Sequence, residues 1–408
     1  MLKLSTFAFK TLKTRPVVSD NVSTSILLQA GFIRQTMAGV YNYTTLGLKV
    51  LRNIENIVRE EMNNYGANEV LLSALSPRDL WEKTARWDKV DVLFKVPAHD
   101  WKEYALNPTH EEVVTPMMNE FIESYKDAWK CVYQIQNKFR NEKRAKSGIL
   151  RGREFLMKDA YSFHIDWVEF DEYYAGMQKV YMNIFKKLGL ADVTYMTLAD
   201  GGDFTEKYSH EFQVEISIWE DTIYVCEDCW IAHNEEVVDL ESGFSCSSCK
   251  STNHKIIKAS EVGNIFPLET KFSNAFGLKM ADENNKAQDV LMGCYGIGIS
   301  RLMWVIAEYF MTDKGIAWPE SIAPASHYII VMKEENLEIA EKLAEKLESQ
   351  WNTVILDDRM WRKIGFGQKA GDCELYGIPN RIAITPKTLD LWGYELTVRW
   401  EESVIVKI

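Results

Sequence analysis

The stretch "FRNEKRAKSGILRGREFLMKDAYSF" (residues 139–163) carries seven Lys or Arg residues between apolar flanks, in a chain whose formal net charge is −12. Residues 130–140, which lead into it, alternate between apolar and polar side chains, and residues 154–163 are again mostly apolar. This pattern predicts two strands joined by a basic hairpin loop. Because side chains two positions apart in a strand point the same way, Arg140 and Glu142 are expected to face one patch.

Cations, a carboxylate and an aromatic ring would gather at the end of this hairpin. Arg151 and Arg153 lie on the returning side, and Phe155 follows two residues later. Guanidinium groups bind phosphate oxygens in pairs, and an aromatic ring can stack on a purine. The combination favours a nucleoside triphosphate over a long nucleic-acid backbone. Taken alone, the same stretch is equally compatible with a charged loop in solvent.

Composition bounds the class of protein. The 408 residues allow two or three domains with a large core. No apolar run approaches the roughly 20 residues that a membrane-spanning helix needs, so no membrane association is expected. The pI near 5.3 argues against non-specific binding of nucleic acid. The mildly basic start (residues 1–16) lacks the apolar segment of a secretory signal, which favours a first strand or arm over a transit peptide and predicts a cytoplasmic protein.

Periodicity predicts a mixed fold of the α/β (α+β) class. Residues 45–65 and 167–188 have the apolar spacing of amphipathic helices, and residues 68–75 have the composition of a buried strand. Residues 318–326 contain two prolines and no periodicity, so they form a predicted linker. Strands alternate with helices after this linker, which predicts a small α/β domain.

"GCYGIGISR" (residues 293–301) predicts a strand, a glycine turn and a helix. Neither the third glycine of a dinucleotide-binding fingerprint nor a P-loop is present, so the motif is weak alone. Gly296 and Gly298 would allow close approach of a ligand to the backbone. Arg301, one turn into the helix, would reach the terminal phosphate of a bound triphosphate.

"NPTHEE" (residues 107–112) offers a second, smaller site. Thr109 and Glu111 share one face if the chain is extended there, and Glu111 would hold an ammonium group or a secondary amine. A helix N-cap, with Thr followed by acidic residues, is the simpler explanation when the motif is taken alone.

Four of the seven cysteines form two C-x-x-C pairs separated by sixteen residues. The spacing is typical of a metal site in which each pair fills two positions of a tetrahedron. Zinc is the expected ion and iron the lesser option, in a structural role because all four positions are filled. Four free thiols in a loop are the alternative. The predicted ligands are Cys226, Cys229, Cys246 and Cys249.

These motifs together resemble a known family. Arg140-x-Glu142, Arg151 with Phe155, and Gly296-x-Gly298-x-x-Arg301 resemble motifs 2 and 3 of class II aminoacyl-tRNA synthetases. "PTHEE", "QIQNKFRNE", "RGREFLMKDAYSFH", "SHEFQV" and "MGCYGIGISR" resemble, in the same order, the motifs of bacterial-type prolyl-tRNA synthetases. The resemblance covers most of the chain.

The resemblance implies a ligase that activates proline with ATP and Mg²⁺ and transfers it to tRNA(Pro). It also implies a homodimer and a catalytic domain whose antiparallel sheet is flanked by helices. A site rich in arginine suits this chemistry, because attack between two anions needs charge neutralisation and fixed geometry. The ATP residues that the resemblance implies are Arg140, Glu142, Arg151, Arg153, Phe155, Gly296, Gly298 and Arg301, of which Arg140 and Arg301 are the catalytic pair.

The same resemblance implies a proline pocket. Glu111 would accept from the secondary ammonium, with Thr109 beside it and Arg140 at the carboxylate. Met157 and His210 would line the ring, and Ser273 would close it. Two departures weaken the family pattern. Ser73 stands where a proline is usual in motif 1, at the dimer interface, and Thr205 to Lys207 are bulkier than the usual residues before "SHEF".

Domain limits follow from the motifs. We predict a catalytic domain over 1–221 and 259–322, a four-cysteine knuckle insert over 222–258 and an anticodon-binding domain over 324–408 with a small basic patch near residues 357–379. About forty residues occupy the place of the long editing insertion of many relatives, too few for such a domain, so no editing in cis is expected. The alternatives are a synthetase for another amino acid, a synthetase-like protein that charges no tRNA, and a nucleic-acid-binding zinc ribbon.

Overall fold

The computed structural model describes residues 1–17, 21–127, 130–144, 148–205, 207–360, 364–399 and 402–407. The chain divides into two compact units. Unit 1 comprises Met1–Thr36, Tyr41–Asn53 and Ile306–Ile408, and unit 2 comprises Met37–Val40 and Ile54–Val305. The domain limits drawn from the motifs stay a prediction.

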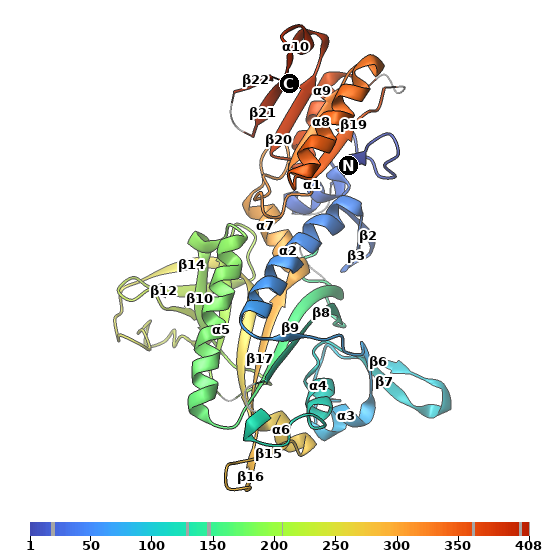
Figure 1. Ribbon diagram of the computed structural model, residues 1–408. Coiled ribbons are helices and arrows are strands. Elements are labelled where there is room, and N and C mark those ends of the chain that lie inside the picture. The colour runs from blue at the N-terminus through green and yellow to red at the C-terminus, as the bar shows by residue number, and fades with distance from the viewer. Residues whose placement is uncertain are drawn as a thin grey trace. The chain divides into compact units, whose positions relative to one another are not determined.

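Unit 2 is built on a nine-stranded sheet. The strands follow the order β11-β10-β13-β12-β14-β17-β9-β8-β4, and α5 lies along one face (Figure 1). The elements are β4 (Asn68–Glu69), β5 (Leu75–Pro77), α3 (Arg78–Lys83), β6 (Phe94–Pro97), β7 (Glu103–Leu106), α4 (Glu111–Met118), β8 (Lys130–Phe139), β9 (Glu154–His164), α5 (Trp167–Lys187), β10 (Thr194–Ala199), β11 (Ser209–Glu215), β12 (Asp221–Cys226), β13 (Ala232–Asn234), β14 (His254–Glu269), α6 (Lys271–Phe276), β15 (Lys279–Ala281), β16 (Ala287–Asp289) and β17 (Leu291–Gly298).

The basic stretch is the end of a β-hairpin, as predicted. β8 and β9 pair antiparallel, with Lys138 opposite Phe155. Residues of β9 therefore alternate between two faces. One face carries Met157 and Asp159, and the other carries Lys158, whose Nζ donates to the hydroxyl of Tyr181 in α5 at 2.6 Å. Helix α5 thus covers one face of this sheet and leaves the other for a pocket.

At the glycine motif the chain passes directly from a strand into a helix, without the separate turn that the sequence predicted. β17 runs to Gly298 and α7 (Ile299–Tyr309) begins at the next residue. A Cβ added at Gly298 would lie 3.1 Å from the Cβ of Arg301, so a larger residue would press on that side chain. The glycine therefore leaves room for Arg301 at the strand's end.

The predicted buried strand over 68–75 is wrong for most of its length. Only β4 and the start of β5 are strand there, and Leu71 between them is 78% exposed. The hydrophobic residues in this segment do not all point to the core, although Leu72 is buried. Composition alone could not distinguish the two cases, because an exposed apolar segment and a buried strand can have the same residues.

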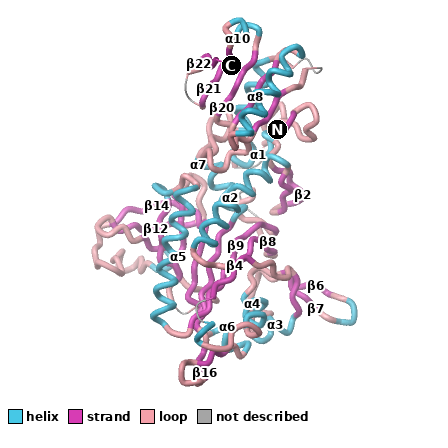
Figure 2. The backbone as a smooth tube through the Cα atoms, viewed as in Figure 1, coloured by secondary structure: helices cyan, strands magenta, loops and turns pink. Residues whose placement is uncertain are grey.

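The predicted four-cysteine insert shares the large sheet. β12 and β13 pair with each other, and β12 also pairs with β14, so residues 221–226 and 254–259 are strand. Most of the chain between them is loop (Figure 2). The strands β12, β13 and β14 share a small apolar cluster formed by Ile223, Val225, Ala232, Ile257 and Ala259.

Unit 1 contains a six-stranded sheet in the order β1-β19-β18-β20-β21-β22. The first four strands are parallel and the last two antiparallel, as the alternation of strands and helices predicts for an α/β domain. The elements are β1 (Leu2–Lys3), α1 (Val22–Ala30), β18 (His327–Val331), α8 (Leu337–Ser349), β19 (Val354–Asp357), α9 (Phe366–Tyr376), β20 (Asn380–Ile384), α10 (Pro386–Asp390), β21 (Gly393–Val398) and β22 (Val404–Lys407). Between residues 33 and 64 lie β2 (Ile33–Met37), β3 (Val40–Tyr43) and α2 (Thr45–Asn64).

The first residues form a strand, as expected. Leu2 pairs with Ile355 of β19, and Ser5 donates to Asp358 from its backbone at 2.7 Å and from its hydroxyl at 2.6 Å. Of the predicted basic patch, Arg359 is bound to Asp357 and Asp372, whereas Arg362 and Lys363 lie outside the described residues. Across the described part of the chain, no helix is both long and apolar enough to cross a bilayer.

Candidate active site

A cavity of about 420 Å³ opens on the face of the unit 2 sheet away from α5. Strands β9, β14 and β17 supply most of the strand residues that line it. Gly296 and Gly298 at the end of β17 keep this part of the cavity open, because neither has a side chain to fill the space. The cavity is lined by ten of the predicted residues, namely Thr109, Glu111, Arg140, Glu142, Arg151, Phe155, Met157, Gly296, Gly298 and Arg301.

Three guanidinium groups converge at one end of the cavity. The Cζ of Arg140 lies 5.2 Å from the centre of the Phe155 ring. Arg301 donates from Nε to the carbonyl of Leu150 at 3.0 Å and from Nη1 to that of Glu261 at 2.8 Å. Burial, and then the nearby Arg301 charge, lowers the pKa of Arg140. Like charges held this close indicate a site for an anion.

Carboxylates accompany these cations. Arg151 Nε lies 3.4 Å from Glu142 Oε2, and Arg301 Nη2 lies 3.3 Å from Glu220 Oε2. Arg301 Nη1 also lies 3.6 Å from Glu261 Oε2. Burial raises the pKa of the Glu261 carboxyl, and Arg301 opposes that rise. Phosphate oxygens of a ligand can replace the carboxylates as partners of these arginines. The carboxylate oxygens would then be free to bind a divalent cation.

The other end of the cavity is built by the start of α4. Glu111 is fully buried, and its Oε1 accepts from the thiol of Cys294 at 3.1 Å. Its Oε2 and the hydroxyl of Thr109 are buried without a hydrogen-bond partner. The N-terminus of a helix favours a carboxylate. Two unpartnered acceptors on residues that line the same cavity suit a ligand with two N–H groups, such as a secondary ammonium.

A buried polar network supports this end from below. Lys138 Nζ lies 2.7 Å from Asp159 Oδ1, and the Tyr161 hydroxyl donates to Asp159 Oδ2 at 2.8 Å. Tyr161 in turn accepts from the backbone N–H of His110 at 2.9 Å. Burial, with Lys138 beside it, lowers the pKa of His110 to about 4, so this imidazole is neutral at pH 7. Asp159 and Tyr161 line the cavity, and their alternation after Met157 in β9 was the signal that could have found them.

Three predicted residues lie away from the cavity. His210 and Glu211 are neighbours in β11, so they point to opposite faces. Glu211 Oε1 accepts from Asn264, which lines the cavity, whereas His210 Nδ1 lies 3.0 Å from the Tyr174 hydroxyl under α5. Burial lowers the pKa of His210 to about 4.

Ser273 and Arg153 are bound elsewhere. The Ser273 hydroxyl in α6 donates to the carbonyl of Val290 at 2.6 Å, inside the core. Arg153 donates from Nε to the carbonyl of Glu142 at 3.0 Å and from Nη1 to that of Ala38 at 2.8 Å. Neither side chain lines the cavity.

The loop before "SHEF" has its own contacts. The Nζ of Lys207 lies 3.9 Å from the centre of the Trp167 ring and 3.1 Å from Glu269 Oε1. Thr205 is buried, and Glu206 lies outside the described residues. Phe204 from the same loop lines the cavity. The bulkier residues are thus accommodated beside the cavity while the loop still reaches it.

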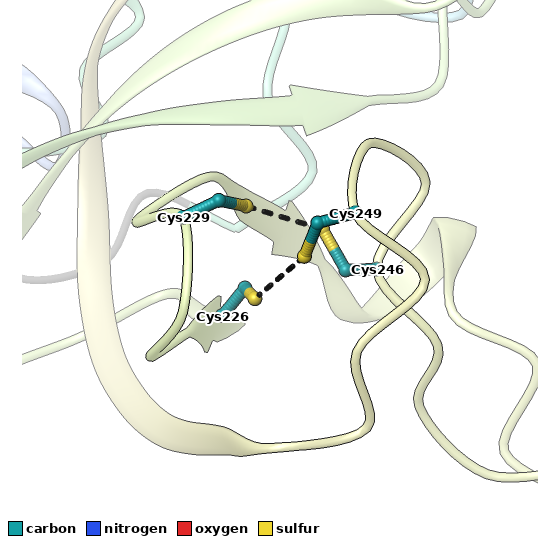
Figure 3. Close-up of side chains that lie close together, drawn as sticks. All are labelled: Cys226, Cys229, Cys246 and Cys249. Carbon is teal, nitrogen blue, oxygen red and sulfur yellow. Dashed lines mark hydrogen bonds between the residues drawn. The ribbon is translucent and has the colours of Figure 1, made fainter.

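The four cysteines of the insert meet at one point (Figure 3). The sulfur of Cys226 lies 3.5 Å from that of Cys249, and the sulfur of Cys229 lies 3.5 Å from that of Cys246. All four sulfurs lie within 4.8 Å of one another. Bonds of about 2.3 Å to a tetrahedral zinc ion would set sulfurs about 3.8 Å apart, so the arrangement fits such an ion.

Relatives of the chain are known. The model of the "tRNA synthetase class II core domain (G, H, P, S and T)" matches residues 94–310. The proline–tRNA ligase of Wolbachia sp. subsp. Drosophila simulans is 36% identical over 400 residues, which cover 95% of this chain and 93% of that protein. The proline–tRNA ligase of Halalkalibacterium halodurans is 30% identical over 555 residues, which cover 99% of this chain and 96% of that protein.

Solved structures share the fold. A Giardia lamblia prolyl-tRNA synthetase in complex with prolyl-adenylate has a TM-score of 0.74 and 20% identity, covering 94% of this chain and 74% of that chain. A prolyl-tRNA synthetase from Cryptosporidium parvum, complexed with halofuginone and AMPPNP, has a TM-score of 0.74 and 16% identity, covering 94% and 72%. The predicted class II catalytic fold is confirmed. The chain belongs to the class II tRNA synthetases and, among them, to the proline–tRNA ligases.

Proposed function

We propose that the cavity of unit 2 carries out both steps of proline–tRNA ligation. In the first step a carboxylate oxygen of proline attacks the α-phosphorus of ATP, and the bond to the leaving pyrophosphate breaks. In the second step the terminal adenosine hydroxyl of tRNA(Pro) attacks the carbonyl carbon of prolyl-adenylate, forming the ester and releasing AMP. One observation carries the proposal: three arginines converge at one end of a cavity whose other end holds two unpartnered, buried acceptors.

The arginine end takes the nucleotide. Arg140 neutralises the α-phosphate and the proline carboxylate, which lowers the repulsion between two anions as they meet. Arg151 and Arg301 bind the outer phosphates. Phe155 stacks on the adenine ring, and Glu142 accepts from the adenine amine. Arg153 is not assigned a contact with ATP, because its guanidinium donates to backbone carbonyls outside the cavity.

The buried end takes proline. The ammonium donates to Glu111 Oε2 and Thr109 Oγ1, the two atoms that lack partners. Met157 packs on the ring, and Tyr161 and Asp159 close the floor. A pocket that selects by size separates substrates differing by one methylene by only about 1–3 kcal/mol, so alanine and cysteine are expected to be activated at a measurable rate.

Two metal ions belong to the proposal. Three carboxylates that line the cavity, Glu220, Asp221 and Glu261, would hold Mg²⁺ and supply its oxygen ligands. It would neutralise charge on the pyrophosphate as it leaves. Zn²⁺ would be held by the four cysteines in a structural role, because a tetrahedron of thiolates leaves no position for substrate.

Editing in cis is proposed to be absent. The alignment with the H. halodurans protein spans 555 positions, whereas this chain has 408 residues, so that relative has a long stretch with no counterpart here. With purified enzyme, the ester of alanyl-tRNA(Pro) is expected to be hydrolysed no faster than in buffer alone. Rapid hydrolysis of that ester would rule the idea out.

We also propose a homodimer, an anticodon-binding domain over residues 324–408 and a cytoplasmic location. Leu71 and Leu75, in the segment that resembles motif 1, are 78% and 44% exposed, which suits a surface covered by a second copy. Light scattering on the wild type and on Leu71→Asp tests the dimer, and a monomeric wild type would contradict it. Binding of tRNA by the full chain with and without charge reversal at Lys387, an exposed residue of α10 in this domain, tests the anticodon-binding assignment, and fractionation of the native cell tests location.

Exchange of pyrophosphate into ATP tests the central proposal. The full chain with ATP and Mg²⁺ is expected to show exchange that depends on proline, at least tenfold above that with threonine, serine or alanine at equal concentration. Charging of tRNA(Pro) then tests the second step. Exchange that prefers another amino acid, or none at all, would overturn the assignment.

A further inference from the structure

Two adjacent carboxylates and one guanidinium are buried together beside the proposed proline site. Glu111 and Glu112 are both fully buried, and Arg86 is 5% exposed. Arg86 Nη1 lies 2.8 Å from Glu112 Oε1 but 3.9 Å from Glu111 Oε2. One cation therefore serves two carboxylates, and it serves them unequally.

The local fold fixes Arg86 in this place. Helix α3 ends before Ala85, which has a positive φ of 55°, and the backbone N–H of Arg86 returns to the carbonyl of Trp81 at 2.9 Å. The turn directs the side chain inward. Its guanidinium carbon then lies among three aromatic rings, with centres at 5.5 Å for Trp81, 4.9 Å for Phe204 and 5.5 Å for Phe272. Rings on several sides leave the guanidinium little freedom beyond the choice between the two carboxylates.

Glu112 is the partner that holds it. Its Oε1 accepts from Arg86 and also from the Thr84 hydroxyl at 2.9 Å. Successive residues of a helix are separated by about 100° around the axis. Glu111 accordingly lines the cavity, whereas Glu112 does not and instead faces the guanidinium.

The surrounding charges do not change this balance. Asp203 and Lys271 also interact with Arg86, and both are exposed, so solvent screens them. Lys138 is a buried cation whose charge reaches Glu111, but its Nζ lies 2.7 Å from Asp159 Oδ1 and is held there. Glu111 Oε2 and Glu112 Oε2 both lack a hydrogen-bond partner, but of the two residues only Glu111 lines the cavity, so its free oxygen is the one open to a ligand.

We propose that Glu112 is a positioning residue for the amino-acid site: by holding Arg86, it keeps the guanidinium from neutralising Glu111. Glu111 then stays available to the ammonium of the amino acid, and the site becomes neutral only when substrate arrives. Glu112 touches no substrate and acts through Arg86. The inference rests on the proposed function, because it assumes that Glu111 accepts the ammonium.

The structure makes an unusual prediction for Glu112→Gln. The amide no longer holds the guanidinium by charge, so Arg86 turns to Glu111 and competes with the substrate ammonium. The KM for proline in pyrophosphate exchange is expected to rise at least tenfold, while the KM for ATP stays within twofold. Glu82→Gln, the same change in an exposed pair with Arg78, is the matched control and should leave both values unchanged.

The double variant Arg86→Gln/Glu112→Gln gives the decisive result. Removing the competing cation should restore the proline KM to within about threefold of the wild type, although a second native residue has been lost. A role in folding alone would make the double variant worse than Glu112→Gln. A proline KM within twofold of the wild type for Glu112→Gln, or no recovery in a folded double variant, would overturn the proposal.

A second measurement on the single variant covers the case in which the double variant does not fold. Tetrahydrofuran-2-carboxylate has the proline ring with an oxygen in place of the ammonium, so Arg86 bound to Glu111 should not weaken its binding. Its inhibition constant is expected to stay within twofold in Glu112→Gln while the proline KM rises. Equal weakening of both ligands would contradict the proposal. If the wild type showed no proline-dependent exchange, the proposed function itself would be contradicted. Failure of the proposed function is therefore distinguishable from failure of the role of Glu112.

Discussion

The two ends of the cavity hold their charges in opposite ways. At the nucleotide end, arginines and glutamates are paired but partly accessible, with the Arg301 and Glu220 side chains 20% and 22% exposed. At the amino-acid end, the Glu111 side chain is fully buried, and only one of its oxygens has a hydrogen-bond partner. At the nucleotide end, an incoming phosphate or cation can replace one partner of an existing ion pair. At the amino-acid end, Glu111 has an oxygen without a partner that can bind one positive charge.

The difference has an energetic meaning. Ion pairs at the surface contribute about 0–1 kcal/mol, and a partly accessible pair lies nearer to that range than a fully buried one, so substrate displaces it at lower cost. A buried charge that loses its partner costs about 3–5 kcal/mol. Substitutions at the amino-acid end should therefore affect one substrate severely, and substitutions at the nucleotide end should be milder and spread over several groups.

Glu111→Gln should have the largest effect. The amide cannot neutralise the ammonium, and a loss of about 3 kcal/mol corresponds to a fall of more than 100-fold in kcat/KM for proline. The KM for ATP should change less than threefold. Exchange kinetics with each substrate varied in turn measure both values, and an equal rise in the two KM values would break the contrast between the ends.

Arg301→Lys comes second. A lysine cannot donate to the carbonyls of Leu150 and Glu261 and also bind phosphate as a fork. Losing one or two charged hydrogen bonds costs about 2 kcal/mol, a fall of roughly 30-fold in kcat/KM for ATP. The KM for proline should stay within threefold. Arg78→Lys, in an exposed pair, provides the control, and a larger effect on proline than on ATP would contradict the assignment of the ends.

Local periodicity predicted much of this architecture. The hairpin of β8 and β9, the helices α2 and α5, and the alternating strands and helices of unit 1 each follow from patterns within one segment. Charge spacing and resemblance likewise identified ten residues that line the cavity. These features needed no knowledge of how distant segments meet.

What the sequence could not predict depends on side-chain direction and on distant contacts. His210 was assigned to the proline pocket from its motif, but strand parity turns it toward Tyr174 under α5. Arg86 has no motif around it and matters only because Phe204, Phe272 and Glu112 come together there. Glu261 was not predicted as a site residue, because no motif surrounds it in the sequence. Its role becomes visible only when the fold places Arg301 beside it.

Removal of the proposed Zn²⁺ should have a smaller and asymmetric effect. β12 begins at Asp221, which lines the cavity, and ends at Cys226, one of the four thiols. Loss of the ion loosens the far end of this strand, so the KM for ATP is expected to rise about three- to tenfold and the KM for proline less than twofold. Cys226→Ser should lower both zinc content and melting temperature.

Elemental analysis, melting curves and exchange kinetics measure these three quantities. Ser248→Ala, between two of the thiols, keeps all four ligands and should retain the metal. A Cys226→Ser variant that binds one equivalent of zinc as tightly as the wild type would contradict the four-thiol site. A proline KM that rises more than the ATP KM would contradict the link through β12.

Lys158→Met should have the smallest effect on activity, because this side chain lies on the face of β9 opposite the cavity. Burial lowers the pKa of Lys158 to about 7, against 10.5 for an ordinary lysine. Below pH 7 the group is charged in both the folded and the unfolded chain, and the folded state bears the full cost of burying the charge. Between pH 7 and 10.5 the unfolded chain binds a proton that the folded chain does not, so wild-type stability rises with pH through this group.

The variant lacks this dependence. The melting temperature of Lys158→Met minus that of the wild type should therefore be highest near pH 6.5 and fall steadily toward pH 9.5. This difference can be positive or negative at a given pH, because the variant also loses the hydrogen bonds from Nζ to Tyr181 and Tyr295. Exchange rates at pH 7.5 should stay within twofold. A difference that stayed flat with pH would mean that the lysine is charged in the folded protein over this range, and a large loss of exchange would mean that the two faces of β9 are not independent.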